Sequence, residues 1–329
     1  MFYVLYARCP LDKTLTYYIP ILNLSQLRYS NAMDSLIIAI PEDPVLVTGL
    51  SGMVGSRFQE LYPDRYRFEN LDLSAGIDIT QAGQIDPLIG SSKASAVLHL
   101  AAYTNVSAAY EEAGDQAGAC YQVNVVGTKN IAKACKKYGK YLIHISTDFV
   151  FDGAKEEPYT EADPPHPIEW YGQTKFLAEQ AVQESLDDWL ILRLAYPYQT
   201  NPVRPDFLKN LIEKLTAGTL PPAFTDHTIT PTFTDDIAAV FDYCLKHRPR
   251  GIYHLVGSSW HTDYEIAQLV KNTFNLPGKV QVGQLDDYLK TIHRPYQKTM
   301  KISNSKLQAE FGLKLCTFTE GLQSIKNQK

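Results

Sequence analysis

The chain has 329 residues, of which 45% are hydrophobic and 20% are charged, and its formal net charge is -5 at pH 7. This length and composition predict a globular protein with one large domain or two joined domains. The acidic balance argues against nucleic acid as a partner. No polybasic run favours a membrane surface, and no apolar stretch approaches the roughly 20 residues that cross a bilayer.

The first 43 residues carry no pattern to which we assign a function. They lack the basic start and the long apolar stretch of a signal peptide. Two explanations stay open. The segment is either an added element of unknown role or the result of a start assigned too early, because Met33 lies just upstream of the first predicted strand.

The cysteines are odd in number and widely spaced, at positions 9, 120, 135, 244 and 316. Without a CxxC pair they predict neither a zinc site nor a disulfide framework. We therefore expect a cytoplasmic protein that holds no metal.

From residue 45 onward, short β-branched runs alternate with longer helical stretches. This alternation implies a parallel sheet covered by helices on both faces. The runs at 96–100 and 141–145 are apolar enough to be central strands. Helices are expected after the first strand, through residue 61, and over 121–138, where Gly139 ends the helix. The predicted strands are 45–48, 67–71, 96–100, 141–145, 189–194 and 251–256.

A glycine-rich turn follows the first predicted strand and opens a helix. Residues 48–55 read Thr-Gly-Leu-Ser-Gly-Met-Val-Gly, which spaces the glycines as GxxGxxG. The first glycine permits a sharp turn, the second lets a pyrophosphate approach the backbone, and the third allows close helix packing. The N–H groups at the helix start favour phosphate. We therefore predict a Rossmann-type dinucleotide site with contacts from Gly49, Ser51, Gly52, Met53 and Val54.

Further along the chain, acidic and small residues extend this predicted cofactor site. Asp72 follows the second strand, where a carboxylate accepts hydrogen bonds from the adenosine ribose. Asp78 and Ile79 come a few residues later and would border the adenine. Ala101 and Ala102 are small at the point where a cofactor would cross the sheet edge.

The choice between NADH and NADPH stays open. Asp72 would repel the 2′-phosphate of NADPH, whereas Arg57, just after the glycine turn, could accommodate it.

Tyr171 and Lys175 are four residues apart, so a helix places them on one face. They follow a loop over 158–167 that contains four prolines. A nearby ammonium would lower the pKa of the tyrosine and make it a usable proton donor. Thr147 stands at the carboxyl end of a central strand, where open α/β sheets bind ligands. We therefore expect these three side chains to carry carbonyl chemistry.

With these motifs the chain resembles the extended short-chain dehydrogenase/reductase superfamily and, within it, the dTDP-4-dehydrorhamnose reductase family. The resemblance runs from about residue 45 to residue 322. It rests on the segments TGLSGMVG, LHLAAYT, VNVVGTKNIAKAC, ISTDFVFDG, PYTEADPPHPIEWYGQTKFLAE, GIYHLVG and RPYQKTMKISNSKL.

The resemblance implies roles for individual residues. Thr147 would bind the substrate carbonyl, Tyr171 would donate the proton, and Lys175 would be its partner. Asn124 matches an asparagine that supports the active-site helix or a proton relay, and we group it and Tyr103 with the cofactor. Thr104, Asp148 and Arg294 are grouped with the substrate, and Arg294 would contact a nucleotide-sugar phosphate.

Three segments depart from the family pattern and leave the exact sugar open. An arginine followed shortly by Ser-Trp is replaced by Arg-Leu-Ala-Tyr-Pro at 193–197. The Asp-Gln-Tyr-Gly segment reads Thr-Asp-His-Thr at 225–228, and charged residues common after AAYT are replaced around 107–109.

We expect an NAD(P)-binding Rossmann domain of residues 44–195 plus about 232–257. A smaller substrate-binding lobe would comprise about 196–231 plus 258–329. The implied activity is NAD(P)H-dependent reduction of a nucleotide-linked 4-keto sugar. Two alternatives stay open: an epimerase or dehydratase of the same superfamily, and a regulatory subunit like that of methionine adenosyltransferase. Phe149 stands where a dehydratase has glutamate, which favours reduction. Whether the chain forms a homodimer is also open.

Overall fold

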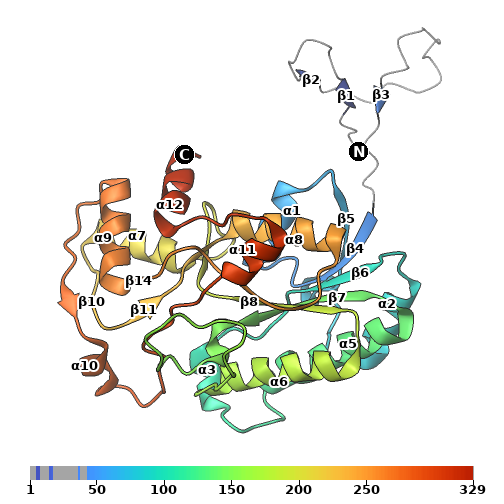
Figure 1. Ribbon diagram of the computed structural model, residues 1–329, viewed down its shortest axis with the longest axis horizontal. Helices are drawn as coiled ribbons and strands as arrows, with labels where there is room; N and C mark the ends of the chain where they lie inside the picture. Colours follow the sequence, from blue (N-terminus) through green and yellow to red (C-terminus); the bar gives the residue numbers. More distant parts are fainter. Residues whose placement is uncertain (1–4, 8–14, 18–35, 38–42, 329) are drawn as a thin grey trace.

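The computed structural model describes residues 5–7, 15–17, 36–37 and 43–328. Its centre is a six-stranded parallel sheet in the order β13-β8-β7-β6-β4-β5 (Figure 1). The predicted α/β class with a doubly wound parallel sheet is confirmed, and the predicted strand ends differ from the observed ones by two residues or less. The strands are β4 (Asp43–Thr48), β5 (Tyr66–Asn70), β6 (Ala96–His99), β7 (Tyr141–Thr147), β8 (Trp189–Leu194) and β13 (Gly251–Leu255).

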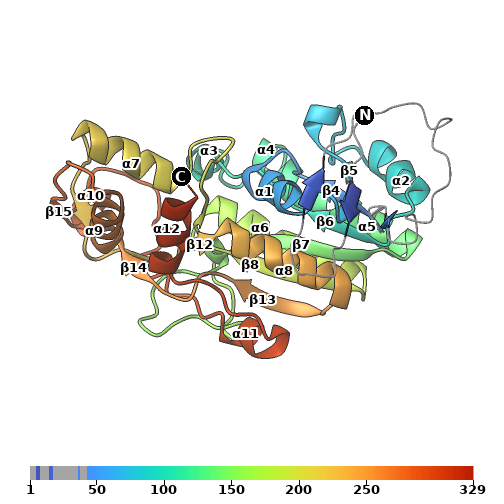
Figure 2. The ribbon, with the colours of Figure 1, turned by 90° about the horizontal axis from the view of Figure 1, so that it is seen from above.

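Helices cover both faces of this sheet (Figures 1 and 2). On one face, α1 (Met53–Leu61) packs against α8 (Thr234–His247), and both bury apolar side chains against β4, β7 and β8. On the other face lie α2 (Ala82–Ser91), α5 (Thr128–Tyr138) and α6 (Trp170–Ser185). The central strands are buried on both sides, which explains their continuous apolar runs.

The predicted helix over 121–138 is divided in the structure. It consists of α4 (Ala119–Tyr121), a π-helical turn (Gln122–Gly127) and α5, and it ends at Gly139 with a φ of +64°. A π-helical turn inside an α-helix often marks a functional position. Here it contains Asn124.

A smaller lobe lies beside the carboxyl edge of the sheet (Figure 1). Its core is formed by α7, α9 and α12 with the short strands around them. Its elements are β9 (Pro197–Tyr198), α7 (Phe207–Ala217), β10 (Ala223–Phe224), β11 (Thr228–Ile229), β12 (Thr232–Phe233), β14 (His261–Thr262), α9 (Asp263–Phe274), β15 (Val282–Gly283), α10 (Leu285–Leu289) and α12 (Phe318–Asn327).

Two features differ from the predicted domain division. Helix α11 (Ser305–Phe311) falls within the predicted lobe, yet Leu307 and Phe311 are buried in the core of the Rossmann sheet. Strand β9 pairs with β12, so this small ladder spans the predicted boundary at residue 232. The chain therefore crosses between the two regions more often than the pattern of prolines and threonines indicates.

Three further helical segments and the N-terminal strands complete the description. Short helix α3 (Val106–Glu111) and the 3₁₀ turns Leu73–Ala75 and Asp148–Val150 follow sheet strands. Strand β1 (Leu5–Ala7) pairs antiparallel with β2 (Leu15–Tyr17) and β3 (Leu36–Ile37). Met33 lies outside the described residues. Within the described part, no helix has the length and apolar character needed to cross a membrane.

Candidate active site

The glycine turn between β4 and α1 is tightly packed against the next strand connection. Gly49 has a φ of +75°, and a side chain there would place its Cβ 2.7 Å from the Ala101 nitrogen. A Cβ on Gly55 would lie 2.6 Å from the Gly49 oxygen. Both positions therefore require glycine. No side chain caps α1 at Gly52, so the first turn of the helix presents its backbone to the cavity.

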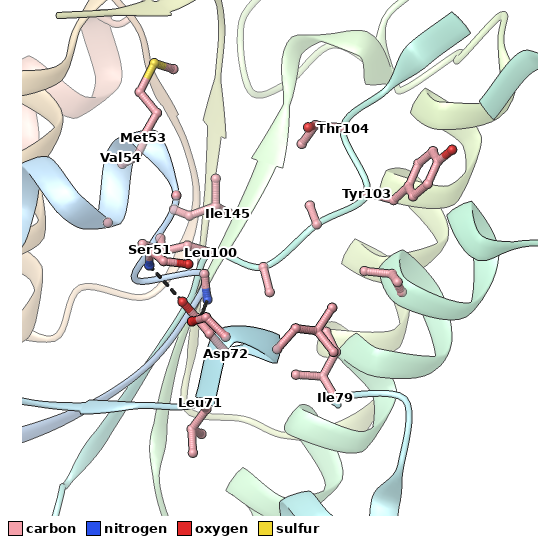
Figure 3. A pocket seen from close by; sticks show the side chains of 18 of the residues that line it. Ser51, Met53, Val54, Leu71, Asp72, Ile79, Leu100, Tyr103, Thr104 and Ile145 are labelled. Carbon is pink, nitrogen blue, oxygen red and sulfur yellow. Dashed lines mark hydrogen bonds between the residues drawn. The ribbon is translucent and has the colours of Figure 1, made fainter. Parts of the chain in front are cut away.

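Asp72 is bound to this turn by backbone hydrogen bonds. Its carboxylate accepts the N–H groups of Gly49, of Leu50 at 3.0 Å and of Ser51 at 2.7 Å. Figure 3 shows the bond from Ser51. Asp72 is buried and also lines the cavity. It thus fixes the shape of the turn, a role that we did not predict, and its contact with an adenosine ribose stays a prediction.

A cavity of about 750 Å³ runs from the glycine turn to the start of α6. Its size is in the range of small-molecule and cofactor sites. Among the predicted site residues, those that line it are Gly49, Ser51, Gly52, Met53, Val54, Asp72, Asp78, Ile79, Ala101, Ala102, Tyr103, Thr104, Tyr171 and Lys175.

Sequence reasoning missed several lining residues. Ser146 precedes Thr147 on β7, and its buried hydroxyl has no hydrogen-bond partner among the described residues. Val203 and Arg204 come from the loop before α7, in a stretch without a motif. The segment 71–77 contributes Leu73, Ser74 and Ile77, which proximity to Asp72 could have indicated.

The three predicted catalytic side chains come together where β7 ends and α6 begins. Tyr171 and Lys175 lie on α6 and are both buried, and the Thr147 hydroxyl is near enough to the Tyr171 phenol to lower the pKa of that phenol. The Lys175 ammonium donates to the Ile145 carbonyl oxygen at 2.6 Å. Tyr171 lines the cavity, whereas Thr147 lies next to Tyr171 and does not itself line the cavity.

The predicted lowering of the Tyr171 pKa is wrong for this structure. Burial raises the pKa of Tyr171, and the hydrogen bond from Thr147 offsets only part of that effect. Burial lowers the pKa of Lys175 to about 8. The cause is desolvation, which disfavours both charged forms and depends on packing that a sequence spacing does not show. The phenol therefore stays protonated at neutral pH.

Asn124 does not line the cavity, and its contact with a cofactor stays a prediction. Its Oδ1 accepts the Tyr103 N–H at 2.8 Å, and its Nδ2 donates to Thr174 Oγ1 at 3.0 Å and to the Tyr103 carbonyl oxygen. The side chain is almost fully buried. These bonds join the loop after β6 to the helix that carries Tyr171 and Lys175, in agreement with the support of the active-site helix that the resemblance implies.

The start of α6 is held by two close contacts. Glu169 caps the helix, and its carboxylate accepts the N–H groups of Tyr171 at 2.9 Å and Gly172 at 2.6 Å. A Cβ on Gly172 would collide with the Phe149 carbonyl oxygen in the turn after β7. Glycine at this position thus lets Tyr171 approach Thr147.

Arg57 is not available to a cofactor phosphate, which corrects that alternative. Its guanidinium makes two hydrogen bonds to Asp235 of α8, at 2.6 and 2.8 Å, and an ion pair with Glu60 at 2.8 Å. It lies outside the set of cavity-lining residues. The helical twist turns position 57 toward α8 rather than toward the glycine turn.

The two remaining predicted substrate residues also lie outside the cavity lining. Asp148 is 2% exposed, and its Oδ1 accepts a hydrogen bond from Thr147 at 3.0 Å. The Arg294 guanidinium lies over the Tyr296 ring, 4.8 Å from the ring centroid. Contacts of either residue with a substrate stay predictions.

The segments that depart from the family pattern surround the same edge of the sheet. Arg193 forms a buried bidentate ion pair with Glu179 of α6, at 2.9 and 2.7 Å. Tyr196 has a φ of +40°, an unusual value for a bulky residue. His227 pairs with Asp263 at 2.8 Å and contacts the Tyr296 ring. Among the residues described, we find no group of three or more potential metal ligands.

A glycine turn that leads into a helix, with a threonine, tyrosine and lysine at the carboxyl edge of the same sheet, defines the class of the extended short-chain dehydrogenases/reductases. The chain belongs to the RmlD substrate binding domain family, whose model matches residues 43–329.

Individual relatives agree with this assignment. The dTDP-4-dehydrorhamnose reductase of Aggregatibacter actinomycetemcomitans is 28% identical over 298 residues, covering 86% of this chain and 98% of that protein. Methionine adenosyltransferase 2 subunit beta of Xenopus laevis is 28% identical over 290 residues, covering 81% and 82%. The crystal structure of the Bacillus anthracis dTDP-4-dehydrorhamnose reductase in complex with NADP superposes with a TM-score of 0.79 at 26% identity, covering 87% and 99%.

Proposed function

We propose that the protein is an NAD(P)H-dependent reductase of a nucleotide-linked 4-keto sugar. The observation that carries this proposal is that Tyr171 and Lys175 line the same cavity as the glycine turn, with Thr147 beside Tyr171. Relatives that align over most of this chain are named as reductases of such sugars. A bound nicotinamide would supply the hydride.

The side chains of this chain would orient the carbonyl and supply the proton. Thr147 would donate a hydrogen bond to the keto oxygen and hold it against the Tyr171 phenol. Tyr171 is buried and protonated, so it can give its proton as the oxygen gains charge. Lys175 would place a positive charge beside the phenolate that remains, and its bond to the Ile145 carbonyl oxygen fixes its position.

We further propose that the preferred cofactor is NADH. The acids Asp72 and Asp78 line the end of the cavity that would hold the adenosine, and Arg57 is bound to Asp235 and Glu60. A 2′-phosphate would therefore meet negative charge there. Calorimetric titration of the free protein with NADH and NADPH tests this, and a lower Kd for NADPH would contradict it.

For the location of the protein we propose the cytoplasm. The four cysteines within the described residues are free thiols, and three of them are buried. Free thiols are usual in a reducing compartment.

Turnover tests the reductase proposal. NADH oxidation would be followed with dTDP-linked 4-keto sugars for the wild type, for Tyr171→Phe and for Tyr288→Phe, which removes an exposed hydroxyl on α10 as a control. We expect activity in the wild type and control, and a loss of about 10²- to 10⁴-fold in Tyr171→Phe. Equal rates in all three proteins would contradict the assigned proton donor.

A regulatory subunit is the second candidate, because the chain aligns over 81% of its length with a methionine adenosyltransferase subunit. Dinucleotide binding without turnover of any keto sugar, unaffected by Tyr171→Phe, would favour it. An epimerase or dehydratase would instead release an isomerised or dehydrated sugar without net oxidation of NADH, which product analysis of the same reactions would reveal.

A further inference from the structure

Thr147 has more hydrogen-bond partners than its single proton can serve. A threonine hydroxyl donates one proton and accepts at two lone pairs. In the structure, the Phe149 N–H donates to Thr147 Oγ1 at 3.3 Å, and Asp148 Oδ1 lies at 3.0 Å. The Tyr171 phenol is the third neighbour, near enough for the Thr147 hydroxyl to lower the pKa of the phenol. The direction of each bond therefore depends on where the protons of Asp148 and Tyr171 are.

Asp148 is buried in a way that makes its charge costly. The residue is 2% exposed, and Oδ2 has no hydrogen-bond partner among the described residues. A carboxylate oxygen in that situation favours the neutral acid, because an unpaired buried charge is strongly disfavoured. Burial raises the pKa of Asp148 to about 7.

Groups from four elements face this carboxyl. Thr147 ends β7, Tyr171 lies on α6, and Tyr196 follows β8. From the lobe, His227 lowers the pKa of Asp148, an effect smaller than that of burial. His227 is in turn paired with Asp263 of α9 at 2.8 Å. The Arg294 guanidinium lies further out, where it lowers the pKa of Tyr196.

We propose that Asp148 is a positioning residue that determines whether Thr147 donates its proton to the substrate. When Asp148 is ionised, Thr147 donates to Oδ1 and accepts from Tyr171, so both donors point away from a bound carbonyl. When Asp148 is neutral, its own proton is donated to Thr147 Oγ1. Together with the bond from the Phe149 N–H, this bond fills both lone pairs of Thr147 Oγ1. The Thr147 and Tyr171 protons are then free for the keto oxygen.

This inference rests on the proposed reductase function and gives it a specific pH dependence. Only the neutral form of Asp148 leaves both donors available, so kcat/KM should fall about tenfold for each pH unit above a midpoint near 7. In Asp148→Asn, the amide can donate to Thr147 at every pH. The variant should therefore lose this alkaline decline and be faster than the wild type at pH 8.5.

The experiment compares pH profiles of kcat/KM for the wild type, Asp148→Asn and Asp236→Asn. Asp236 is a suitable control because burial also raises the pKa of this carboxyl, yet it lies on α8 beside Cys316. We expect the decline near pH 7 in the wild type and in Asp236→Asn alone. The same decline in Asp148→Asn would overturn the proposal. Thr147→Ser should keep the decline and Thr147→Val should lose it, which provides a second test if Asp148→Asn does not fold.

A measurement without substrate separates this inference from the reductase proposal. Infrared difference spectra of the free protein, taken between pH 5.5 and pH 8.5, report the carbonyl stretch of neutral carboxyl groups. We expect a band that disappears with a midpoint near pH 7 and that is missing from Asp148→Asn. If the wild type and Asp148→Asn give the same spectra, Asp148 does not change its protonation state between pH 5.5 and pH 8.5 and the inference fails, whether or not any keto sugar is reduced.

Discussion

The two ends of the cavity are built from different parts of the chain. At the glycine turn the backbone forms the wall, and Asp72 holds three consecutive N–H groups in place. At the start of α6 the wall includes the buried side chains of Tyr171 and Lys175, and Thr147 lies behind them, next to Tyr171. The first end tolerates few changes of shape, whereas the second is sensitive to changes of charge and protonation.

Removing the charge at the α6 end should have the largest effect. Lys175→Met should lower kcat/KM by about 10²- to 10⁴-fold, because the phenolate left by Tyr171 loses its cation. It should also stabilise the protein near pH 7. The pKa of Lys175 is lowered from 10.5 to about 8, so ionisation in the folded state costs on the order of 3 kcal/mol.

The same variant also tests in which direction the free energy of unfolding changes with pH. Between pH 8 and 10.5 the unfolded wild type binds more protons at Lys175 than the folded protein, so wild-type stability should rise with pH in this window relative to Lys175→Met. Urea unfolding of both proteins at pH 7 and at pH 10 measures this. A stability difference that does not change with pH would contradict the burial of a charged lysine.

A change of shape at the same end should come next. In Gly172→Ala the new Cβ collides with the Phe149 carbonyl oxygen and moves Tyr171 away from Thr147. A displacement of about 1 Å at a reacting group can cost roughly 10²-fold in rate. Gly83→Ala in α2 is the matched control, because nothing lies within 4 Å of its Cβ. Steady-state kinetics that show equal rates for the two variants would argue against this tight contact.

The glycine turn can be tested with a pair of glycines of nearly equal φ. Gly49 and Gly76 have φ values of +75° and +76°, but only a Cβ on Gly49 meets backbone atoms, 2.7 Å from the Ala101 nitrogen. Gly76→Ala should cost about 1 kcal/mol of stability, whereas Gly49→Ala should cost more and weaken NADH binding at least tenfold. Thermal unfolding and calorimetric titration measure both, and similar results for the pair would remove the steric argument.

The smallest effect should come from adding a cation beside Asp72. Leu73 is 74% exposed and lines the cavity, so Leu73→Arg should lower the Kd for NADPH by about two- to fivefold with less effect on NADH. Leu61→Arg adds the same charge at the far end of α1. If both variants improve NADPH binding equally, the effect arises from net charge rather than from a contact near the ribose.

The sheet could be predicted closely, whereas the direction of individual side chains could not. Continuous apolar runs reveal buried parallel strands, and the glycine spacing reveals the turn between β4 and α1, because both depend on local sequence. Arg57 follows that turn directly, yet a bidentate partner 178 residues away determines where its guanidinium lies. The packing of α11 against the Rossmann sheet likewise depends on distant contacts.

The same limit explains the outcome at the active site. The spacing of Tyr171 and Lys175 correctly indicates one helical face, and the structure places both in the cavity wall. The sign of the Tyr171 pKa change was wrong because desolvation exceeds the effect of neighbouring charges. Asn124 could be identified from its segment, but its partners became apparent only when the π-helical turn placed it between Tyr103 and Thr174.

The amide of Asn124 has a mechanical consequence. Its Oδ1 accepts the N–H group of Tyr103, in the loop that lines the cavity, and its Nδ2 donates to Thr174, the helix residue next to Lys175. The side chain is 1% exposed, so a displacement of that loop by a ligand would be passed to the active-site helix through buried hydrogen bonds. The loop after β6 and the helix that carries Tyr171 and Lys175 are therefore coupled through one side chain.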